Sequence, residues 1–570
     1  MILRMTEAQT HAARLAARFG AVVASIVFAG LAISQGPPVP PEGPGIERDI
    51  QYVFVIVGIV ATIIAWRWSL PGGLLLVLAA IVLGMQSAGR YSEQTALIAA
   101  MLYVVPGVLF LAHWSGRRPV WLQAPLVAAV VAAMVYGGLE ARATHDRAFG
   151  PAHPQSALTQ QPYDFVEWVW SGGVTATGAT VNARITDDDA KQARLVVSQD
   201  PAFASPAYSK YVAVEDERDG VVSLRLDGLA PGTSYYYGVE VDGVQDTQRT
   251  GSFETFPDGA ATFSIVVSAC ARTGSNGLVF EAMAAEDALL YVIPGDFHYE
   301  NIVASNAGAF RSAYRAQLTA PAQAALYQQT PIAYVWDDHD FGGSNSNGSS
   351  AASGAARLAY RENVPHYELV AGAGDAPIYQ AFSVGRVRFV MTDTRSMRDL
   401  EQMAAGSDSL LGKEQRDWLL QELLAGSRDY ELVVWVNSVP WIAPAAGGRD
   451  DWGGYATERT EIANFIAANG ITNLIMLSGD AHMLAIDDGT NTDYSDNGGA
   501  AFPLMQAATL DRPGSIKGGP YSEGAYPGAG QYGLVTFRDT GDSMTVEMSG
   551  RNWLREEIVR YEFMVPRAGS

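Results

Sequence analysis

The sequence predicts a multi-domain chain in which an α-helical membrane region is followed by a β-sandwich and then by an α/β core. Three observations support this: long apolar stretches near the start, short alternating segments divided by turns, and strands that alternate with helical patterns. A chain of 570 residues is long enough for several domains. We expect a membrane region over residues 1–145, a linker over 146–162, the β-sandwich over 163–257 and the core over 258–570.

The membrane region is predicted from five apolar stretches. Most of them approach the 20 or so residues that a helix needs to cross the hydrocarbon of a bilayer. The first could instead be a cleavable signal peptide, because it lies near the N-terminus and ends in small residues. The stretches are Phe19–Ser34, Ile50–Trp66, Leu70–Gln86, Thr95–Ala112 and Val120–Gly138.

Arginines set the expected orientation. Arg4, Arg14 and Arg18 precede the first stretch, and Arg117 and Arg118 lie between the fourth and fifth, whereas the loop after the first stretch is acidic and rich in proline. The positive-inside rule places the N-terminus in the cytoplasm. An odd number of spans then places the rest of the chain in the periplasm or outside the cell, anchored in the cell (inner) membrane.

Charge is distributed unevenly along the chain. Residues 1–150 carry ten Arg, no Lys and seven acidic residues, so the remainder has a net charge near −25. This excludes nucleic acid as an expected partner, since its binding depends on Lys and Arg at phosphates. The chain has one cysteine, Cys270, so no intrachain disulfide can form. That thiol is either a metal ligand or a small buried hydrophobic residue.

The pattern of residues 163–257 predicts a β-sandwich. The segments Ala179–Ile185 and Ala193–Ser198 have the composition of strands and are bounded by Asp, Gly and Pro turns. The stretch from Leu229 to Tyr235 resembles the tyrosine corner of fibronectin type III-like domains. No catalytic set of residues occurs there, so we expect a spacer or packing role.

The region after residue 258 alternates strand and helix patterns. Amphipathic helices are predicted over Lys413–Ala425 and Glu458–Ala468. Buried strands are predicted over residues 263–269, 288–294, 332–336 and 474–478. This alternation indicates an α/β core.

Polar clusters follow four of these predicted strands, and they carry the chemistry. They contain Cys270, Asp296 with Tyr299, Asp338 with His339, and Asp480 with His482. Rigid strands can direct such side chains to one point, and residues two apart on extended chain face the same way. A single Asp at a strand end is usually a cap or turn residue. However, three of the four histidines after residue 260 fall in these clusters, which favours a multinuclear metal site of a hydrolase.

Taken together, the motifs resemble the PhoD-like alkaline phosphatases, a branch of the calcineurin-like metallophosphoesterases. The resemblance covers residues 160–550 and implies a metallophosphoesterase core, in which a β-sandwich is flanked by helices. The main matching segments are Ser268–Cys270, Gly295–Glu300, Trp336–Gly342 and Ser478–His482. Further agreement comes from Asp393–Ser396, Leu411–Leu419 and Trp452–Arg459.

The resemblance implies two kinds of metal ion and a role for each ligand. The residues that match an Fe(III) set are Cys270, Asp296, Tyr299 and His482. Those that match a second site, associated with Ca(II), are Asp296, Asp338 and Asp480, and other divalent metals remain candidates. His339 matches a catalytic histidine that stabilises the transition state or protonates the leaving oxygen.

Four further residues are candidates for substrate binding. Arg395 and Arg361 are expected to hold phosphate oxygens, with a structural ion pair as the alternative for each. Asn345 and Asn437 are expected to bind the second metal ion or the phosphate.

The predicted function is a membrane-anchored extracytoplasmic phosphatase that hydrolyses phosphoesters with metal-activated hydroxide. Its expected partners are a phosphoester substrate and the lipid bilayer, while the physiological substrate and oligomeric state stay open. One alternative is a phosphodiesterase or phospholipase D-type activity on lipids or envelope polymers. Another is a non-enzymatic calcium-binding membrane protein, against which Cys270 and Tyr299 argue because neither suits a purely calcium-binding role.

Overall fold

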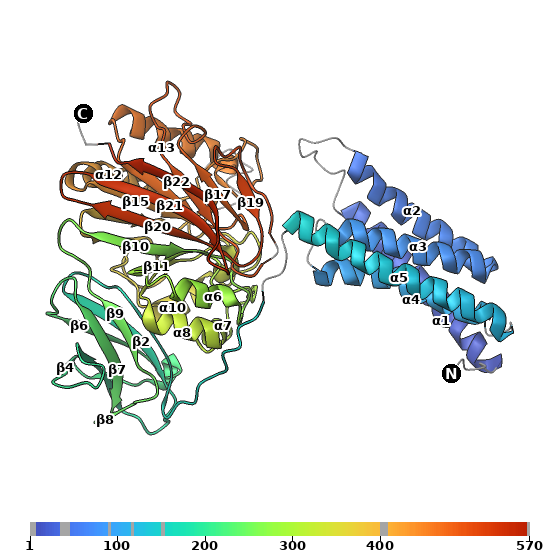
Figure 1. Cartoon of the computed structure of the whole chain (residues 1–570), viewed down its shortest axis with the longest axis horizontal. Coiled ribbons are helices and arrows are strands. Elements are labelled where there is room, and N and C mark those ends of the chain that lie inside the picture. The colour runs from blue at the N-terminus through green and yellow to red at the C-terminus, as the bar shows by residue number, and fades with distance from the viewer. Residues whose placement is uncertain are drawn as a thin grey trace. The chain divides into compact units, whose positions relative to one another are not determined.

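The computed structural model describes residues 7–34, 46–88, 93–115, 119–149, 154–398, 409–512 and 514–566. The chain divides into two compact units, Met1–Pro151 and Ala152–Ser570, and each is described by itself (Figure 1). Arg4, most of the acidic loop after the first apolar stretch, and Arg117 with Arg118 lie outside the described residues. The orientation argument therefore stays a prediction.

The first unit consists of helices, and each of the five apolar stretches lies in one of them. Small residues let α3 and α4 approach closely: a Cβ added to Gly107 would lie 3.1 Å from the carbonyl oxygen of Gly73. Such contacts between small residues are common where helices pack in membranes. The helices are α1 (Glu7–Ser34), α2 (Ile46–Arg67), α3 (Ser69–Ala88), α4 (Glu93–Ser115) and α5 (Val120–Phe149).

The length and apolarity of these helices support fewer spans than the five predicted. Among the described residues, only the window Ala124–Ala141 of α5 is both long and apolar enough to cross a membrane. The apolar parts of the three preceding helices are shorter, namely Val57–Arg67, Ser69–Met85 and Ala100–Ser115. A single such helix is weak evidence for a membrane region, so five spans are not supported.

The second unit is built on two large sheets. The nine-stranded sheet has the order β22-β21-β20-β10-β11-β12-β1-β2-β6. Its centre is parallel, because β10 pairs with β11 and β11 with β12 in the same direction. The strands are β10 (Thr262–Val267), β11 (Leu290–Pro294), β12 (Ile332–Val335), β20 (Gln531–Asp539), β21 (Met544–Asn552) and β22 (Glu557–Met564).

Strands from the predicted β-sandwich complete this sheet. β1 (Val166–Gly172) joins β12 in parallel through Gly172 and Ile332, and β2 (Gly178–Ile185) and β6 (Val221–Asp227) follow it. The sheet thus runs from the β module into the core. The module also contains a smaller sheet that carries the tyrosine corner, in which the Tyr235 hydroxyl accepts from the Ala230 N–H at 3.0 Å. Its strands are β3 (Gln192–Ser198), β4 (Ala207–Tyr208), β5 (Val212–Ala213), β7 (Ser234–Val241), β8 (Val244–Gln245) and β9 (Gly251–Glu254).

The seven-stranded sheet has the order β13-β14-β15-β16-β18-β17-β19. Four consecutive strands in it, from β14 to β18, are parallel. Its strands are β13 (Gln380–Val384), β14 (Val387–Met391), β15 (Leu432–Asn437), β16 (Leu474–Ser478), β17 (Met483–Asp487), β18 (Leu504–Ala507) and β19 (Ala525–Pro527).

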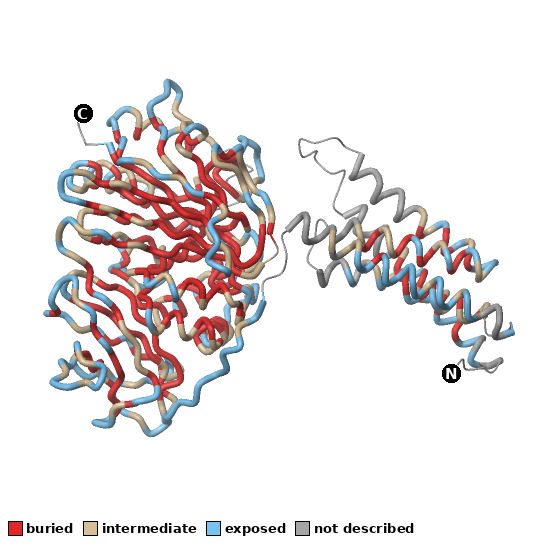
Figure 2. Tube along the Cα trace, viewed as in Figure 1, coloured by how far each residue is buried: buried red, intermediate tan, exposed pale blue. Residues whose placement is uncertain are grey.

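The two sheets pack face to face, since β17 contacts β20, β21 and β22, and β18 contacts β20. Helices cover the outer faces: α6, α7, α8 and α10 pack at the nine-stranded sheet, and α12 and α13 at the seven-stranded sheet. Buried residues are continuous through the sheets (Figure 2). The predicted multi-sheet α/β architecture is confirmed. The helices are α6 (Leu278–Ala284), α7 (Ala307–Leu318), α8 (Pro321–Gln329), α9 (Asp338–Phe341), α10 (Ser353–Asn363), α12 (Lys413–Asp429) and α13 (Ala456–Ala468).

Candidate metal centre

Four predicted metal ligands lie in tight turns just after parallel strands. Cys270 follows β10 and Asp296 follows β11, while Asp480 and His482 follow β16. All four have left-handed backbone conformations, with φ of 66°, 51°, 64° and 52°. Residues other than glycine rarely adopt this backbone conformation, because it costs about 1–3 kcal/mol for each residue. Residues that do adopt it cluster at functional sites. The two sheets thus deliver polar side chains to one place through strained turns.

Gly295 makes this convergence sterically feasible. Its φ is 106°, and a Cβ added there would lie 2.5 Å from the Cβ of Asp337. Only glycine allows the end of β11 to approach the end of β12 this closely. Asp296 is therefore placed beside Asp337 and Asp338.

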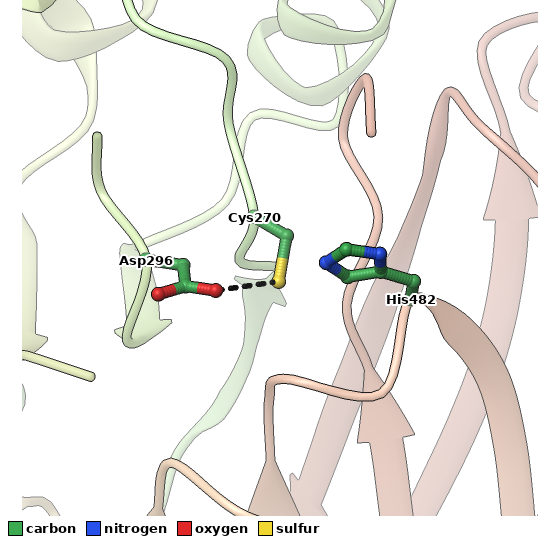
Figure 3. A group of neighbouring side chains, drawn as sticks. All are labelled: Cys270, Asp296 and His482. Carbon is green, nitrogen blue, oxygen red and sulfur yellow. Dashed lines mark hydrogen bonds between the residues drawn. The ribbon is translucent and has the colours of Figure 1, made fainter. Parts of the chain in front are cut away.

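The first donor group contains a thiol, a carboxyl, a phenol and an imidazole. Cys270 Sγ donates to Asp296 Oδ2 at 3.4 Å, and the Tyr299 hydroxyl donates to the same oxygen at 2.5 Å. The Tyr299 hydroxyl is also 2.9 Å from His482 Nε2. Figure 3 shows Cys270, Asp296 and His482 converging from different segments. The structure brings together all four residues predicted for the iron set.

The ionised forms of these residues are unfavourable in the buried protein without a cation. Burial raises the pKa of the Cys270 thiol and of the Tyr299 phenol well above their ordinary values. Burial, together with the neighbouring charges of Asp338 and Asp337, does the same for the Asp296 carboxyl. A metal ion reverses this preference, because ligating thiols and carboxyls bind in their deprotonated forms.

A second donor group consists mainly of carboxylates around Asp296. Ligand atoms of Asp296, Asp338 and His339 lie within 4.8 Å of one another, and so do those of Asp296, Asp337 and Asp480. Asp296 Oδ1 and Asp337 Oδ2 are buried and have no hydrogen-bond partner among the described residues. Oxygen donors of this kind suit a hard cation such as calcium, so the residues present fit the metal ions that the sequence predicts.

The carboxyls of the second group differ in electrostatic environment. Burial opposes ionisation of Asp338, yet Arg395, His339 and the Asn345 N–H lower its pKa below the ordinary value. Burial raises the pKa of Asp480 to about 7, although Lys517 lowers it in part. The Lys517 ammonium donates to Asp480 Oδ1 at 2.6 Å.

His339 is held at the edge of the cluster. Its Nδ1 lies 2.5 Å from Asn301 Oδ1, and the Asn301 amide nitrogen donates to the Tyr299 carbonyl oxygen at 3.2 Å. The ring centres of His339 and Tyr299 are 4.0 Å apart. Burial lowers the pKa of His339, and Arg512 lowers it further, against the opposing effect of Asp338. The imidazole is thus oriented by an amide on one side and a ring on the other.

Arg395 lies in the cluster but is fully engaged by protein carboxylates. Its Nε donates to Asp337 Oδ1 at 2.5 Å, and its two Nη atoms donate to Asp450 at 2.9 and 3.0 Å. The side chain has no exposed surface. The expectation that it holds phosphate is therefore replaced by the structural ion pair.

Arg361 is also occupied elsewhere. Its Nη2 donates to the carbonyl oxygens of Ala376 at 2.7 Å and Gly372 at 3.3 Å, which belong to the segment after α10. Neither acceptor is a member of a donor group, so the predicted phosphate-binding role of Arg361 has no support in the structure. Its contacts are not an ion pair either, because both acceptors are backbone carbonyls.

Asn345 and Asn437 border the cluster in different ways. The Asn345 N–H donates to Asp338 Oδ2 at 2.5 Å, so its backbone rather than its amide orients that carboxylate. Asn437 Oδ1 accepts from the Val439 N–H and from Trp452 Nε1, at 3.1 and 3.2 Å. Its amide nitrogen is buried without a hydrogen-bond partner among the described residues.

The sequence prediction missed several residues of this centre. Asp337 was part of a recognised motif, but only its neighbour Asp338 was assigned as a ligand. Asn301, two residues after Tyr299, carried no signal of its own. Lys517 carried a weak signal, since it is one of only four lysines in the chain. Arg512 and Asp450 become visible only in three dimensions.

Comparison with known proteins gives matches over both parts of the second unit. The family described as PhoD-like phosphatase matches residues 265–509, and the PhoD-like phosphatase N-terminal domain matches residues 151–257. Residues 5–120 match a domain of unknown function, DUF7670.

Individual proteins and solved structures are similar to parts of this chain. Alkaline phosphatase D of Bacillus subtilis (strain 168) is 25% identical over 363 residues, which cover 55% of this chain and 59% of that protein. A solved structure described as PhoD superposes with a TM-score of 0.57 at 19% identity, covering 70% of this chain and 90% of the other. A dimetal phosphatase from Danio rerio gives a TM-score of 0.32 at 14% identity, covering 54% of this chain and 99% of the other.

The match to the curated relative spans less than two thirds of that protein's length. The fold, by contrast, is shared with the solved PhoD structure over most of its length. The two PhoD-like models match adjacent segments that together make up more than half of the sequence. On these grounds the chain belongs to the PhoD-like phosphatase family.

Proposed function

We propose that this chain is a metal-dependent phosphatase that hydrolyses phosphoesters at the centre described above. The observation that carries the proposal is the convergence of Cys270, Asp296, Tyr299 and His482 with further carboxylates around Asp296. Thiol, phenol and imidazole donors beside a group of carboxylates match two metal ions of different character. Family membership supports the same reaction class.

The donor sets suggest which residues hold which ion. Cys270, Asp296, Tyr299 and His482 fit Fe(III), and Asp296 with Asp338 and Asp480 fits Ca(II) or another divalent cation. Asp337 adds a further buried carboxylate beside the second set. When bound, such ions would supply an activated water as nucleophile and stabilise the negative charge on the phosphoryl oxygens.

His339 is suited to deliver a proton to the leaving oxygen. Asn301 Oδ1 can only accept, so the hydrogen bond between them places a proton on His339 Nδ1. This leaves Nε2 as the atom that exchanges a proton with substrate. The Tyr299 ring, tilted against the imidazole with ring centres 4.0 Å apart, restricts rotation of the imidazole. His339 acts as the general acid of the proposed reaction in its doubly protonated form, which carries a second proton on Nε2 and which the neighbouring Asp338 carboxylate favours.

The metal proposal is tested by elemental analysis and a visible spectrum of the purified full chain. A phenolate on Fe(III) absorbs visible light, so the protein should be coloured, and Asp296→Asn should lose both colour and metal. Colourless, iron-free protein with full activity would refute the ligand assignment.

The reaction is tested by assaying a phosphomonoester and a phosphodiester side by side. We expect His339→Ala to lower kcat by about 10²- to 10⁴-fold, the range of general acid–base catalysis. Preference for the diester would favour the phosphodiesterase alternative. Wild-type activity in Asp296→Asn would refute the mechanism.

We also propose that the first unit anchors the protein in the cell (inner) membrane, with its N-terminus cytoplasmic and the phosphatase unit in the periplasm or outside the cell. Support comes from α5, where Val127, Val131, Val135 and Leu139 form a stripe whose members are 52–66% exposed. An exposed apolar stripe of this length is unfavourable in water.

One end of the helical unit adds a second argument. Arg18 lies over the Trp66 ring at 4.7 Å, and Arg14 and Arg18 both donate to the Trp66 carbonyl oxygen. Tryptophan beside arginine is typical of the membrane–water interface. Cell fractionation tests the proposal: the chain should sediment with membranes and resist carbonate extraction, and external protease should digest the phosphatase unit. Recovery in the soluble fraction would refute it.

A further inference from the structure

Two basic side chains lie beside the candidate metal centre on the segment that follows β18. The Lys517 ammonium donates to Asp480 Oδ1 at 2.6 Å. The guanidinium carbon of Arg512 is 4.2 Å from the centre of the Tyr299 ring. Asp480 and Tyr299 both belong to the donor groups, so the two cations border the centre from the same segment of chain.

The backbone on both sides of Lys517 is fixed by contacts with the strand ends. The Ser515 N–H donates to the His482 carbonyl oxygen at 2.9 Å. The Gly519 N–H donates to the Ile442 carbonyl oxygen at 3.0 Å. Lys517 is thus anchored to the same turn that presents Asp480 and His482, and its position follows from the fold rather than from a mobile surface side chain.

Both cations remain available for a ligand. The Lys517 side chain is 40% exposed, and an ammonium has three donors. Within the described part of the chain, no ion pair joins Arg512 to an acidic side chain, and its Nε has no hydrogen-bond partner. Arg395 differs, because its guanidinium is fully buried and is bonded to both Asp337 and Asp450. Arg361, the other arginine predicted to hold phosphate, is bonded to backbone carbonyl oxygens. Lys517 uses one of its three donors on Asp480, so its other donors stay available beside the centre.

We propose that Lys517 and Arg512 bind the non-bridging oxygens of the substrate's phosphoryl group and favour a dianionic phosphomonoester over a monoanionic diester. This inference rests on the proposed phosphatase function and names its anion-binding residues. The physical reason is charge, because the carboxylates of the centre repel a phosphate. Two cations offset this repulsion, and they do so more strongly for a dianion. The carboxylates concerned are Asp296, Asp337, Asp338 and Asp480.

The test is calorimetric titration of inorganic phosphate into the purified, metal-loaded full chain. Lys517→Met should weaken phosphate binding by about 10- to 100-fold, as expected for loss of a charge-assisted hydrogen bond. Lys517→Arg should restore part of the affinity. Lys210→Met is the matched control, since it removes the same charge from an exposed site in the β module. Metal content should be equal in all four proteins.

Kinetics provide a second readout. In Lys517→Met, KM for p-nitrophenyl phosphate should rise more than KM for bis(p-nitrophenyl) phosphate, with a smaller change in kcat. Arg512→Met should show the same pattern, and it keeps the test decisive if the Lys517 variant fails to fold.

Three outcomes would overturn the inference. The first is unchanged phosphate affinity in Lys517→Met and Arg512→Met, and the second is an equal change in KM for both esters. The third is loss of metal from Lys517→Met, which would show that the lysine positions the metal-binding carboxylates. A wild-type protein that binds phosphate through Lys517 but hydrolyses neither ester would refute the proposed function and leave the anion site standing.

Discussion

Replacing Arg395 by methionine separates a structural role from a substrate-binding role. Methionine fills similar space but removes the guanidinium, so Asp337 loses a donor at 2.5 Å and Asp450 loses two. Arg395 and Asp337 are both fully buried, while Asp450 keeps its contact with Arg398. Breaking a buried ion pair by removing one partner costs about 3–5 kcal/mol, because the remaining charge is left uncompensated.

This free energy converts into a measurable fall in melting temperature. The unit Ala152–Ser570 has about 400 residues, and unfolding entropies near 2.1 cal/mol/K per residue give about 0.9 kcal/mol/K. We therefore expect the Tm of Arg395→Met to fall by about 3–6 °C, measured by circular dichroism of the purified full chain.

Arg357→Met is the matched control for Arg395→Met. The Arg357 side chain is only 8% exposed, but its partner Asp375 is 71% exposed. An ion pair of this type contributes about 1 kcal/mol or less, so the control should lose about 1 °C at most. If Arg395→Met instead melts within a degree of wild type while KM rises tenfold, the structural assignment of Arg395 is wrong.

Three further predictions concern positioning, pH and metal. Asn301→Ala releases the His339 ring, so kcat should fall roughly 10- to 100-fold with little change in KM; equal losses in both constants would contradict this. Burial raises the pKa of Glu458 to about 7, so the folded chain retains a proton that the unfolded chain loses above about pH 4.5. Stability should therefore fall as pH rises through this window. Glu458→Gln keeps the acceptor for the Leu410 N–H. Its Tm should match that of wild type at pH 5 and exceed it at pH 8. If the difference between the two Tm values is instead the same at both pH values, the Glu458 carboxyl does not titrate in this window. Chelation should lower the Tm of wild type by several degrees but leave Asp296→Asn unaffected, because only the folded wild-type site binds the ion.

The local features of the site could be predicted from the sequence. Each motif follows its own strand, so Asp296 after β11 and Asp480 after β16 were recognisable from a few neighbouring residues. The helix predicted over Lys413–Ala425 lies within α12 for the same reason. The apolar stretches of the first unit are helices, but apolarity alone did not determine how many of them are long enough to span a bilayer.

Non-local features could not be predicted in this way. Arg395 is separated from Asp450 by 55 residues, so its burial between carboxylates has no signature in its motif. The pairing of β1 with β12 joins segments 160 residues apart and merges the β module with the core sheet. Lys517 lies 37 residues beyond Asp480 in a segment without recognisable motif. In each case the missing information was which distant strand ends meet.

The division of the donor residues between two sheets determines when the centre can form as the chain is made. Tyr299 and His482 are separated by 183 residues, yet they contact each other in the finished protein. At a synthesis rate of about 5–20 residues per second, His482 is made roughly 10–40 s after the Cys270 thiol and the Asp296 carboxyl. Until the second sheet packs against the first, the Cys270 thiol lacks His482 as a neighbouring donor. Loading of the correct ion therefore belongs to the last stage of folding.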